Sequence, residues 1–197
     1  MKVVIDTNSL LSLVRYYLPF DKNSILYDFF KKKIEKGQII IIDSVLDECT
    51  YNSKGIVIST LNYLTDKAFL KSFKVPYKTE SLIAPSPAKF LRQVENQFVN
   101  TIVRKQRKLT ETEFENQKNA YLNGADMKQI ILCLNLLKDD NRLIGVEEVV
   151  LVTEETESGN DNKLFKKIPA ICKELNIPTM TLPELIERFD GIDIDFK

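Results

Sequence analysis

The chain has 197 residues, of which 44% are hydrophobic and 28% are charged, and its 28 acidic residues balance its 28 basic residues. This length and composition are typical of one globular domain that buries enough apolar surface to fold without disulfides. The neutral balance gives no sign of a strong non-specific affinity for nucleic acid, although a local patch can still be basic. Because the chain contains no histidine, a His general base, a Ser-His-Asp triad and a His-rich zinc site are excluded.

Two further features predict a cytoplasmic protein. The N-terminal segment MKVVIDTN lacks the apolar region of a secretion signal, and no apolar run approaches the roughly 20 residues of a membrane span. Cys49, Cys133 and Cys172 are isolated along the chain and odd in number. This pattern favours buried free thiols in a reducing compartment.

Strand and helix signals alternate in the N-terminal part of the chain. A β-branched run at Val3–Ile5 predicts a strand buried on both faces, and residues 25–34 carry the apolar stripe of a helix. Residues 39–42 are four consecutive isoleucines, which predict the most clearly buried strand of the chain. We expect the next helix to begin near Asp43 or Ser44, which are both favourable N-caps.

The same alternation returns in the C-terminal part. We expect a helix over residues 124–138, a strand over 149–152, a helix over 164–175, a last strand over 177–181 and a closing helix over 182–189. The order of strands and helices predicts an α/β fold, a three-layer α/β/α sandwich with a mostly parallel sheet.

The middle third of the chain is more polar and is interrupted by prolines. Residues 62–68 and 89–117 have the pattern of helices. We interpret residues 55–121 as a helical insertion in a single domain that spans residues 1–197.

Carboxylates follow two of the predicted strands. Asp6 comes directly after the first strand, and Thr153, Glu154 and Glu155 come after the strand over 149–152. Each acid alone is also explained as a helix cap or a loop residue. Because ligands bind at the carboxyl ends of the strands in an open parallel sheet, the coincidence predicts a shared acidic site.

Two more acids are candidates for this site. Asp126 lies four residues before Ile130 and eight before Leu134, on the apolar face of its predicted helix, where an acid is costly unless something compensates it. An interaction with the N-terminus of its own helix is the alternative explanation. Glu48 follows the isoleucine strand, and either turns back over the strand end or is an exposed helix residue.

Four converging carboxylates would repel one another, by roughly 3 kcal/mol for a pair about 5 Å apart at an effective dielectric constant of 20. A divalent cation removes this conflict, and oxygen ligands without imidazole select Mg²⁺ or Mn²⁺ over Zn²⁺. Such an ion lowers the pKa of a bound water and neutralises charge on a phosphate. The acids therefore predict a hard-cation site suited to phosphoryl chemistry.

Four segments of the sequence resemble those of the PIN-domain family. The opening VVIDTN resembles the first strand of that family with its first acid, and SVLDE at 44–48 resembles the segment with the second. GAD at 124–126 is similar to the third, and VLVTEE at 150–155 resembles the strand whose end carries the fourth. The resemblance covers residues 1–52 and 122–182, and the ordered set of four is more specific than the opening motif alone.

The resemblance implies a metal-dependent endoribonuclease that hydrolyses RNA with a water activated by one or two Mg²⁺ or Mn²⁺ ions. The residues it implies as metal ligands and catalytic groups are Asp6, Glu48, Asp126 and Glu155. Thr7, Asn8 and Thr153 are implied to assist them. Many members of the family are toxins of toxin–antitoxin pairs, so RNA, a small antitoxin protein and a second copy in a homodimer are the implied partners.

The sequence departs from the family at two places. The fourth site usually carries Asp, whereas Glu155 stands there in this chain, and Asp161 in the following polar stretch is an alternative fourth ligand. The insertion over 55–121 is longer than in compact toxins and affects the surfaces used for the dimer and the antitoxin.

A run of basic residues in the insertion is a candidate for contact with RNA phosphates. It consists of Arg104, Lys105, Arg107 and Lys108. A solvated helix face explains the same run.

Two other functions fit parts of the sequence. Loss of one metal-binding acid, for which Glu155 is the candidate, would leave a non-catalytic PIN-like module that binds RNA or a protein. A haloacid-dehalogenase-like phosphatase also has a strand that ends in Asp and works through an aspartyl phosphate. It needs a second Asp two positions after the first, where this chain has Asn8.

Overall fold

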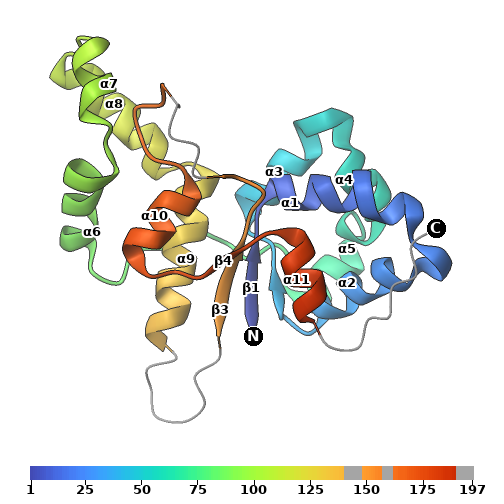
Figure 1. The fold of residues 1–197 in the computed structure, drawn as a ribbon. Helices are drawn as coiled ribbons and strands as arrows, with labels where there is room; N and C mark the ends of the chain where they lie inside the picture. Colours follow the sequence, from blue (N-terminus) through green and yellow to red (C-terminus); the bar gives the residue numbers. More distant parts are fainter. Residues whose placement is uncertain (140–147, 157–161, 190–197) are drawn as a thin grey trace.

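A four-stranded, all-parallel sheet with the strand order β2-β1-β3-β4 lies at the centre of the molecule. The computed structural model describes residues 1–139, 148–156 and 162–189. The strands are β1 (Lys2–Ile5), β2 (Ile39–Ile40), β3 (Val149–Val152) and β4 (Thr179–Met180). Helices cover both faces of the sheet (Figure 1), so the predicted α/β/α sandwich is confirmed.

The helices on one side of the sheet come mainly from the first half of the chain (Figure 1). They are α1 (Thr7–Ser12), α2 (Ile25–Glu35), α3 (Asp43–Tyr51), α4 (Ile56–Thr60), α5 (Lys67–Phe73) and α11 (Leu182–Arg188). The helices on the other side are α6 (Pro87–Gln93), α7 (Thr101–Gln106), α8 (Glu111–Leu122), α9 (Ala125–Asp139) and α10 (Ile168–Leu175). Short π- and 3₁₀-helical turns join several of them, among them a π turn at Leu13–Tyr17 that continues α1.

Residues 55–121 are divided between the two faces of the sheet. Helix α4 packs against α1 and α3, whereas α8 packs against α9 on the opposite face. Buried side chains from both halves, such as Val57 and Phe98, belong to the same hydrophobic cluster as the strands. The helices of this stretch therefore help to form the central core. That the stretch is an insertion stays a prediction.

Residues 89–117 are mostly helical, as predicted, but they belong to several helices. The chain leaves helical geometry at Val99, and two new helix starts follow, each with its own cap. The Asn100 side chain accepts hydrogen bonds from the first turn of α7, and Thr110 forms a capping box with Glu113 at the start of α8. Asn, Ser and Thr favour N-caps because their oxygens satisfy amide groups that lack a partner in the first turn.

Two other predicted elements are shorter than expected. In the isoleucine run, only Ile39–Ile40 pairs with β1, because the Tyr77 amide donates to the Ile41 carbonyl at 2.8 Å and the chain then turns into α3. Helix α10 begins at Ile168 rather than at Leu164, since the preceding residues pair with another segment. The Lys166 amide donates to the Phe98 carbonyl at 2.8 Å. Contacts between distant segments end both elements.

The central strands are fully buried, as a parallel sheet covered on both faces requires. All four residues of β3 and the Val3–Ile5 part of β1 have 0% exposure. Burial of each such side chain contributes about 1.5–3 kcal/mol. The three cysteines are free and buried, as predicted. None of the helices within the described ranges is long and apolar enough to cross a bilayer.

Candidate metal and catalytic site

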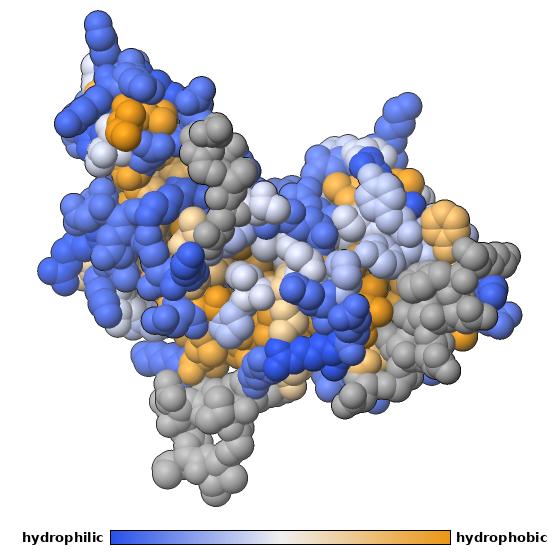
Figure 2. Space-filling view, in the orientation of Figure 1, coloured by the Kyte–Doolittle hydropathy of each residue, from blue (hydrophilic) through white to orange (hydrophobic). Residues whose placement is uncertain are grey.

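The carboxyl ends of β1 and β3 are joined directly. The backbone amide of Asp6 donates a hydrogen bond to the Val152 carbonyl at 2.9 Å, so the residues that follow the two strands lie side by side. The surface is hollowed above this edge of the sheet, between the α7–α8 side and the α3–α4 side (Figure 2). This is the position at which an open parallel sheet binds its ligands.

Asp6 is the buried centre of this edge, with 4% exposure. Its carboxylate accepts hydrogen bonds from the Thr7 amide at 2.8 Å, from Gln129 Nε2 at 3.2 Å and from Thr153 Oγ1 at 3.3 Å. The first of these makes Asp6 the N-cap of α1. Three donors compensate the burial of the carboxylate and hold it in one orientation.

Gln129 is a site residue that the sequence analysis missed. It is fully buried on α9, three residues after Asp126 and therefore on the same helix face. The amide nitrogen donates to Asp6, and Gln129 Oε1 is buried with no hydrogen-bond partner among the residues that the structure describes. The available signal was a glutamine among the apolar residues Met127, Ile130 and Ile131 of one helix.

Asp126 is half-buried in the first turn of α9. The pKa of its carboxyl is raised from 3.8 to about 6, chiefly by burial and then by the negative charges of Asp6, Glu155 and Glu48, in that order of size. Lys163 acts in the opposite direction. Asp126 therefore interacts electrostatically with all three of the other predicted acids, in addition to its position at a helix N-terminus.

Glu48 reaches the site from α3. Its side chain is exposed, and its Oε2 accepts a hydrogen bond from Thr7 Oγ1 at 2.5 Å. Thr7 itself is buried, whereas the neighbouring Asn8 is exposed. Thr7 thus links the first acid's helix to the second acid.

The two glutamates after β3 have different surroundings. Glu154 Oε1 accepts from the Leu182 amide at 2.8 Å and from Ser9 Oγ at 3.3 Å, which ties the start of α11 to α1. Glu155 Oε2 accepts from the Ile168 amide at 3.3 Å, at the start of α10, and its charge is the one that acts on Asp126. Glu155, not Glu154, is thus the fourth acid of the cluster. Asp161, the alternative, lies outside the described residues.

The donor set fits a hard cation better than a soft one. It consists of carboxylates and the amide oxygen of Gln129. The pKa of the nearby Cys49 thiol is raised to about 12, chiefly by burial and then by the charges of Glu48 and Asp6. In the parts of the chain that the structure describes, no group of three Asp, Glu or Cys side chains is arranged to hold an ion directly. Mg²⁺ usually keeps several of its waters, so carboxylates can also hold it through water.

Comparison with known protein families gives a match over the C-terminal part of the chain. Residues 77–191, more than half of the chain, match DUF4411, a domain of unknown function. The chain belongs to the DUF4411 family. No curated protein and no solved structure matches it. The matched region contains Asp126, Gln129 and Glu155, whereas Asp6 and Glu48 precede it.

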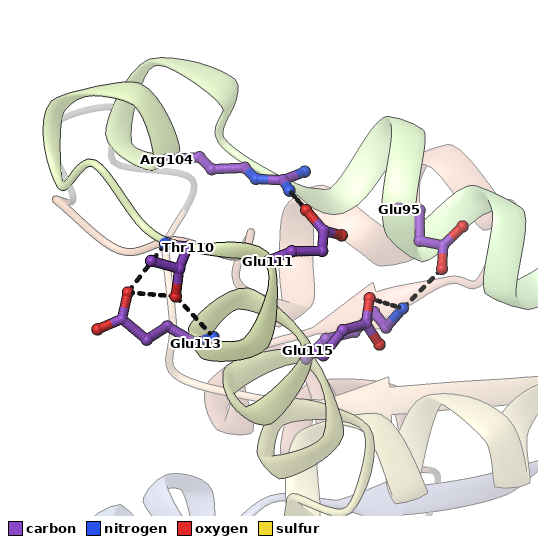
Figure 3. Close-up of polar contacts among 7 residues, drawn as sticks. Glu95, Arg104, Thr110, Glu111, Glu113 and Glu115 are labelled. Atoms are coloured by element: carbon purple, nitrogen blue, oxygen red, sulfur yellow. Dashed lines mark hydrogen bonds and ion pairs between the residues drawn. The ribbon is translucent and has the colours of Figure 1, made fainter.

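The basic run of this DUF4411 chain does not form one continuous phosphate-binding surface. Figure 3 shows Arg104 pointing at Glu111. Arg104 Nη2 lies 2.7 Å from Glu111 Oε2, and the guanidinium lies 3.7 Å from the centre of the Phe114 ring. Arg107 donates to the carbonyl of Asn162. Arg104 therefore holds α7 against α8. The other two residues of the run, Lys105 and Lys108, are exposed.

Proposed function

We propose that this protein is a PIN-like endoribonuclease that depends on Mg²⁺ or Mn²⁺ and acts in the cytoplasm. The observation that carries the proposal is the raised pKa of Asp126, whose causes after burial are the charges of three acids from other elements. A folded protein keeps such a cluster of like charges at a cost, and clusters of this kind occur most often at functional sites.

Each residue of the cluster has a distinct part in the proposal. Asp6, Asp126, Glu48 and Glu155 would hold a cation that keeps several of its waters between itself and the carboxylates. The bound cation would supply charge neutralisation on the phosphodiester and a water of lowered pKa. Gln129 orients Asp6, and its carbonyl oxygen, which has no partner within the described ranges, can accept from a donor such as a water molecule at the centre of the site.

The direct test compares wild type, Asp6→Asn and Asp66→Asn on a fluorescent single-stranded RNA, with Mn²⁺ and with EDTA. Asp66 is a matched control because it also caps a helix, α5, through its side chain, far from the acids in sequence. Asn is as good an N-cap as Asp, so both variants should fold. We expect Mn²⁺-dependent cleavage by wild type and Asp66→Asn, and a loss of roughly 100-fold or more in Asp6→Asn.

Two results would contradict the proposal. Equal cleavage by wild type and Asp6→Asn would identify a contaminating nuclease as the source of the activity. Retained Mn²⁺ binding without cleavage by any of the three proteins would favour the non-catalytic alternative.

That alternative is a PIN-like module that binds RNA or a protein without cutting. It is favoured by one observation, namely that Glu155 and Glu48 already accept hydrogen bonds from the Ile168 amide and from Thr7. The toxin role, with a small antitoxin and a homodimer as partners, is implied by the PIN resemblance. It would be tested by co-purification with the product of the neighbouring gene.

A further inference from the structure

A pocket of about 330 Å³ adjoins the acidic cluster. It lies between Arg107, α8, the first turn of α9 and residues 163–167, and Asp126 belongs to both the pocket and the cluster. The residues that matter most to its chemistry are Arg107, Tyr121, Asp126, Lys163, Lys166 and Lys167.

The lining of this pocket is strongly basic in a protein with no net charge. It carries four Lys or Arg side chains and one carboxylate. Lys166 is paired with Glu174, and Arg107 donates to a carbonyl while keeping its remaining guanidinium donors. Lys163 is exposed and close enough to Asp126 for its charge to lower the pKa of that acid. The basic side chains of the pocket therefore lie next to the acidic cluster, with Asp126 between them.

The basic segment is held by rigid neighbours. The rings of Tyr121 and Phe165 are stacked, with centroids 4.3 Å apart and planes 10° from parallel, and Tyr121 Oη donates to the Lys166 carbonyl at 3.1 Å. Backbone hydrogen bonds fix the same segment on its other side, where the Asn100 amide donates to the Leu164 carbonyl at 2.7 Å. Binding groups on such a support lose little freedom when a ligand is bound.

We propose that this pocket binds a backbone phosphate of the RNA strand that lies across the acidic cluster, with Lys163 and Arg107 as its main contacts. The inference rests on the proposed ribonuclease function. An acidic site repels a polyanion, and a bound cation offsets that repulsion at the phosphate it contacts. Neighbouring phosphates need a separate source of positive charge, and the pocket supplies it next to the acidic cluster.

The test uses two double variants that each remove two positive charges. Lys163→Gln/Arg107→Gln changes the pocket, and Lys32→Gln/Lys36→Gln changes exposed residues on and just after α2, on the other face of the sheet. Both are made in the Asp6→Asn background, where the RNA stays intact, and thermal unfolding checks their folding. Binding of a short unstructured fluorescent RNA is measured by anisotropy over a series of salt concentrations.

We expect the pocket variant to weaken binding by roughly tenfold, as for the loss of a charge-assisted hydrogen bond. The slope of log affinity against log salt should become shallower by about 0.7 for each phosphate that the variant no longer neutralises. The α2 variant should match its parent. With Asp6 restored, the pocket variant should raise KM for RNA cleavage and change kcat little, because a group remote from the reacting phosphate binds substrate and transition state alike.

The outcomes separate the two proposals. Equal binding by the pocket and α2 variants would overturn the pocket proposal, even where wild type cleaves RNA. A selective loss of binding in the pocket variant would support it, even where no cleavage is found and the ribonuclease proposal fails. The absence of RNA binding by the Asp6→Asn parent at low salt would overturn it.

Discussion

Gln129 donates a hydrogen bond to Asp6 Oδ1 at 3.2 Å and so joins two buried residues that are 123 positions apart in the chain. This hydrogen bond links the second turn of α9 to the end of β1. It also leaves Gln129 Oε1 buried without a hydrogen-bond partner in the described part of the chain. The pair forms the innermost part of the candidate site, with Asp126, Glu48 and Glu155 around it.

Replacing Gln129 with Met should lower the stability of the metal-free protein and weaken Mn²⁺ binding. Met has a similar size, but it cannot donate to Asp6, and a buried carboxylate that loses a hydrogen bond costs about 1–3 kcal/mol. For a chain of this length, that corresponds to a fall in Tm of several degrees. Gln106→Met, on the exposed surface of α7, is the control. Equal Tm and Mn²⁺ affinity in both variants would show that the hydrogen bond to Asp6 supports neither property.

The metal-free protein should lose stability as the pH rises from about 4 to about 6 because of Asp126. Its pKa is about 6 in the folded state and near 3.8 in the unfolded state, so the folded protein binds the extra proton in this window. The stabilisation that a raised pKa gives is fully present below the pKa of the unfolded state. It is lost as the pH rises to the pKa of the folded state, and here the free energy of unfolding falls by about 3 kcal/mol in total.

Urea unfolding of wild type and Asp126→Asn across this pH range measures the effect. Other carboxyls titrate in both proteins, so the difference between the two curves isolates Asp126. We expect the free energy of unfolding of Asp126→Asn to increase relative to that of wild type as the pH rises. Parallel curves would contradict the raised pKa. In wild type, Mn²⁺ should bind more tightly as the pH rises through about 6, because cation and proton compete for the same carboxylate.

Glu154→Ala and Glu155→Ala should differ in their effect on activity, although the two residues are neighbours. Each change removes a hydrogen bond to the first amide of a helix, α11 for Glu154 and α10 for Glu155, which costs about 1 kcal/mol. Of these two glutamates, Glu155 is the one whose charge raises the pKa of Asp126. We therefore expect both variants to lose stability and only Glu155→Ala to lose RNA cleavage. A larger loss of cleavage in Glu154→Ala, measured well below both Tm values, would reverse the assignment.

Arg104→Ala should destabilise the protein without weakening RNA binding. The guanidinium pairs with Glu111 and stacks over Phe114, and together these interactions are worth about 1 kcal/mol at a partly exposed position. Chemical denaturation should show the loss, and anisotropy in the Asp6→Asn background should show an unchanged affinity for RNA. Lys89→Ala, an exposed residue on α6, is the control for stability. Weaker RNA binding by Arg104→Ala would contradict this prediction and would indicate that Arg104 contacts RNA phosphates.

Local patterns in the sequence were sufficient to predict much of the fold. The β-branched runs at β1 and β3 and the apolar stripes of α2 and α9 are visible in short windows. A strand buried on both faces is a continuous apolar run, and a helix buried on one face has apolar residues at a fixed periodicity. The order of these elements was enough to predict the parallel sheet. It also placed Asp6 and the acids after Thr153 at the carboxyl ends of two strands, at one edge of the sheet.

Which of these side chains meet is a property of the tertiary structure alone. Gln129 lies against Asp6, Glu155 rather than Glu154 acts on Asp126, and Arg104 is paired within the α7–α8 segment. The early end of β2 and the late start of α10 likewise follow from backbone bonds to Tyr77 and Phe98. Interactions of this kind depend on chain segments that are distant in sequence, and no local propensity or periodicity contains them.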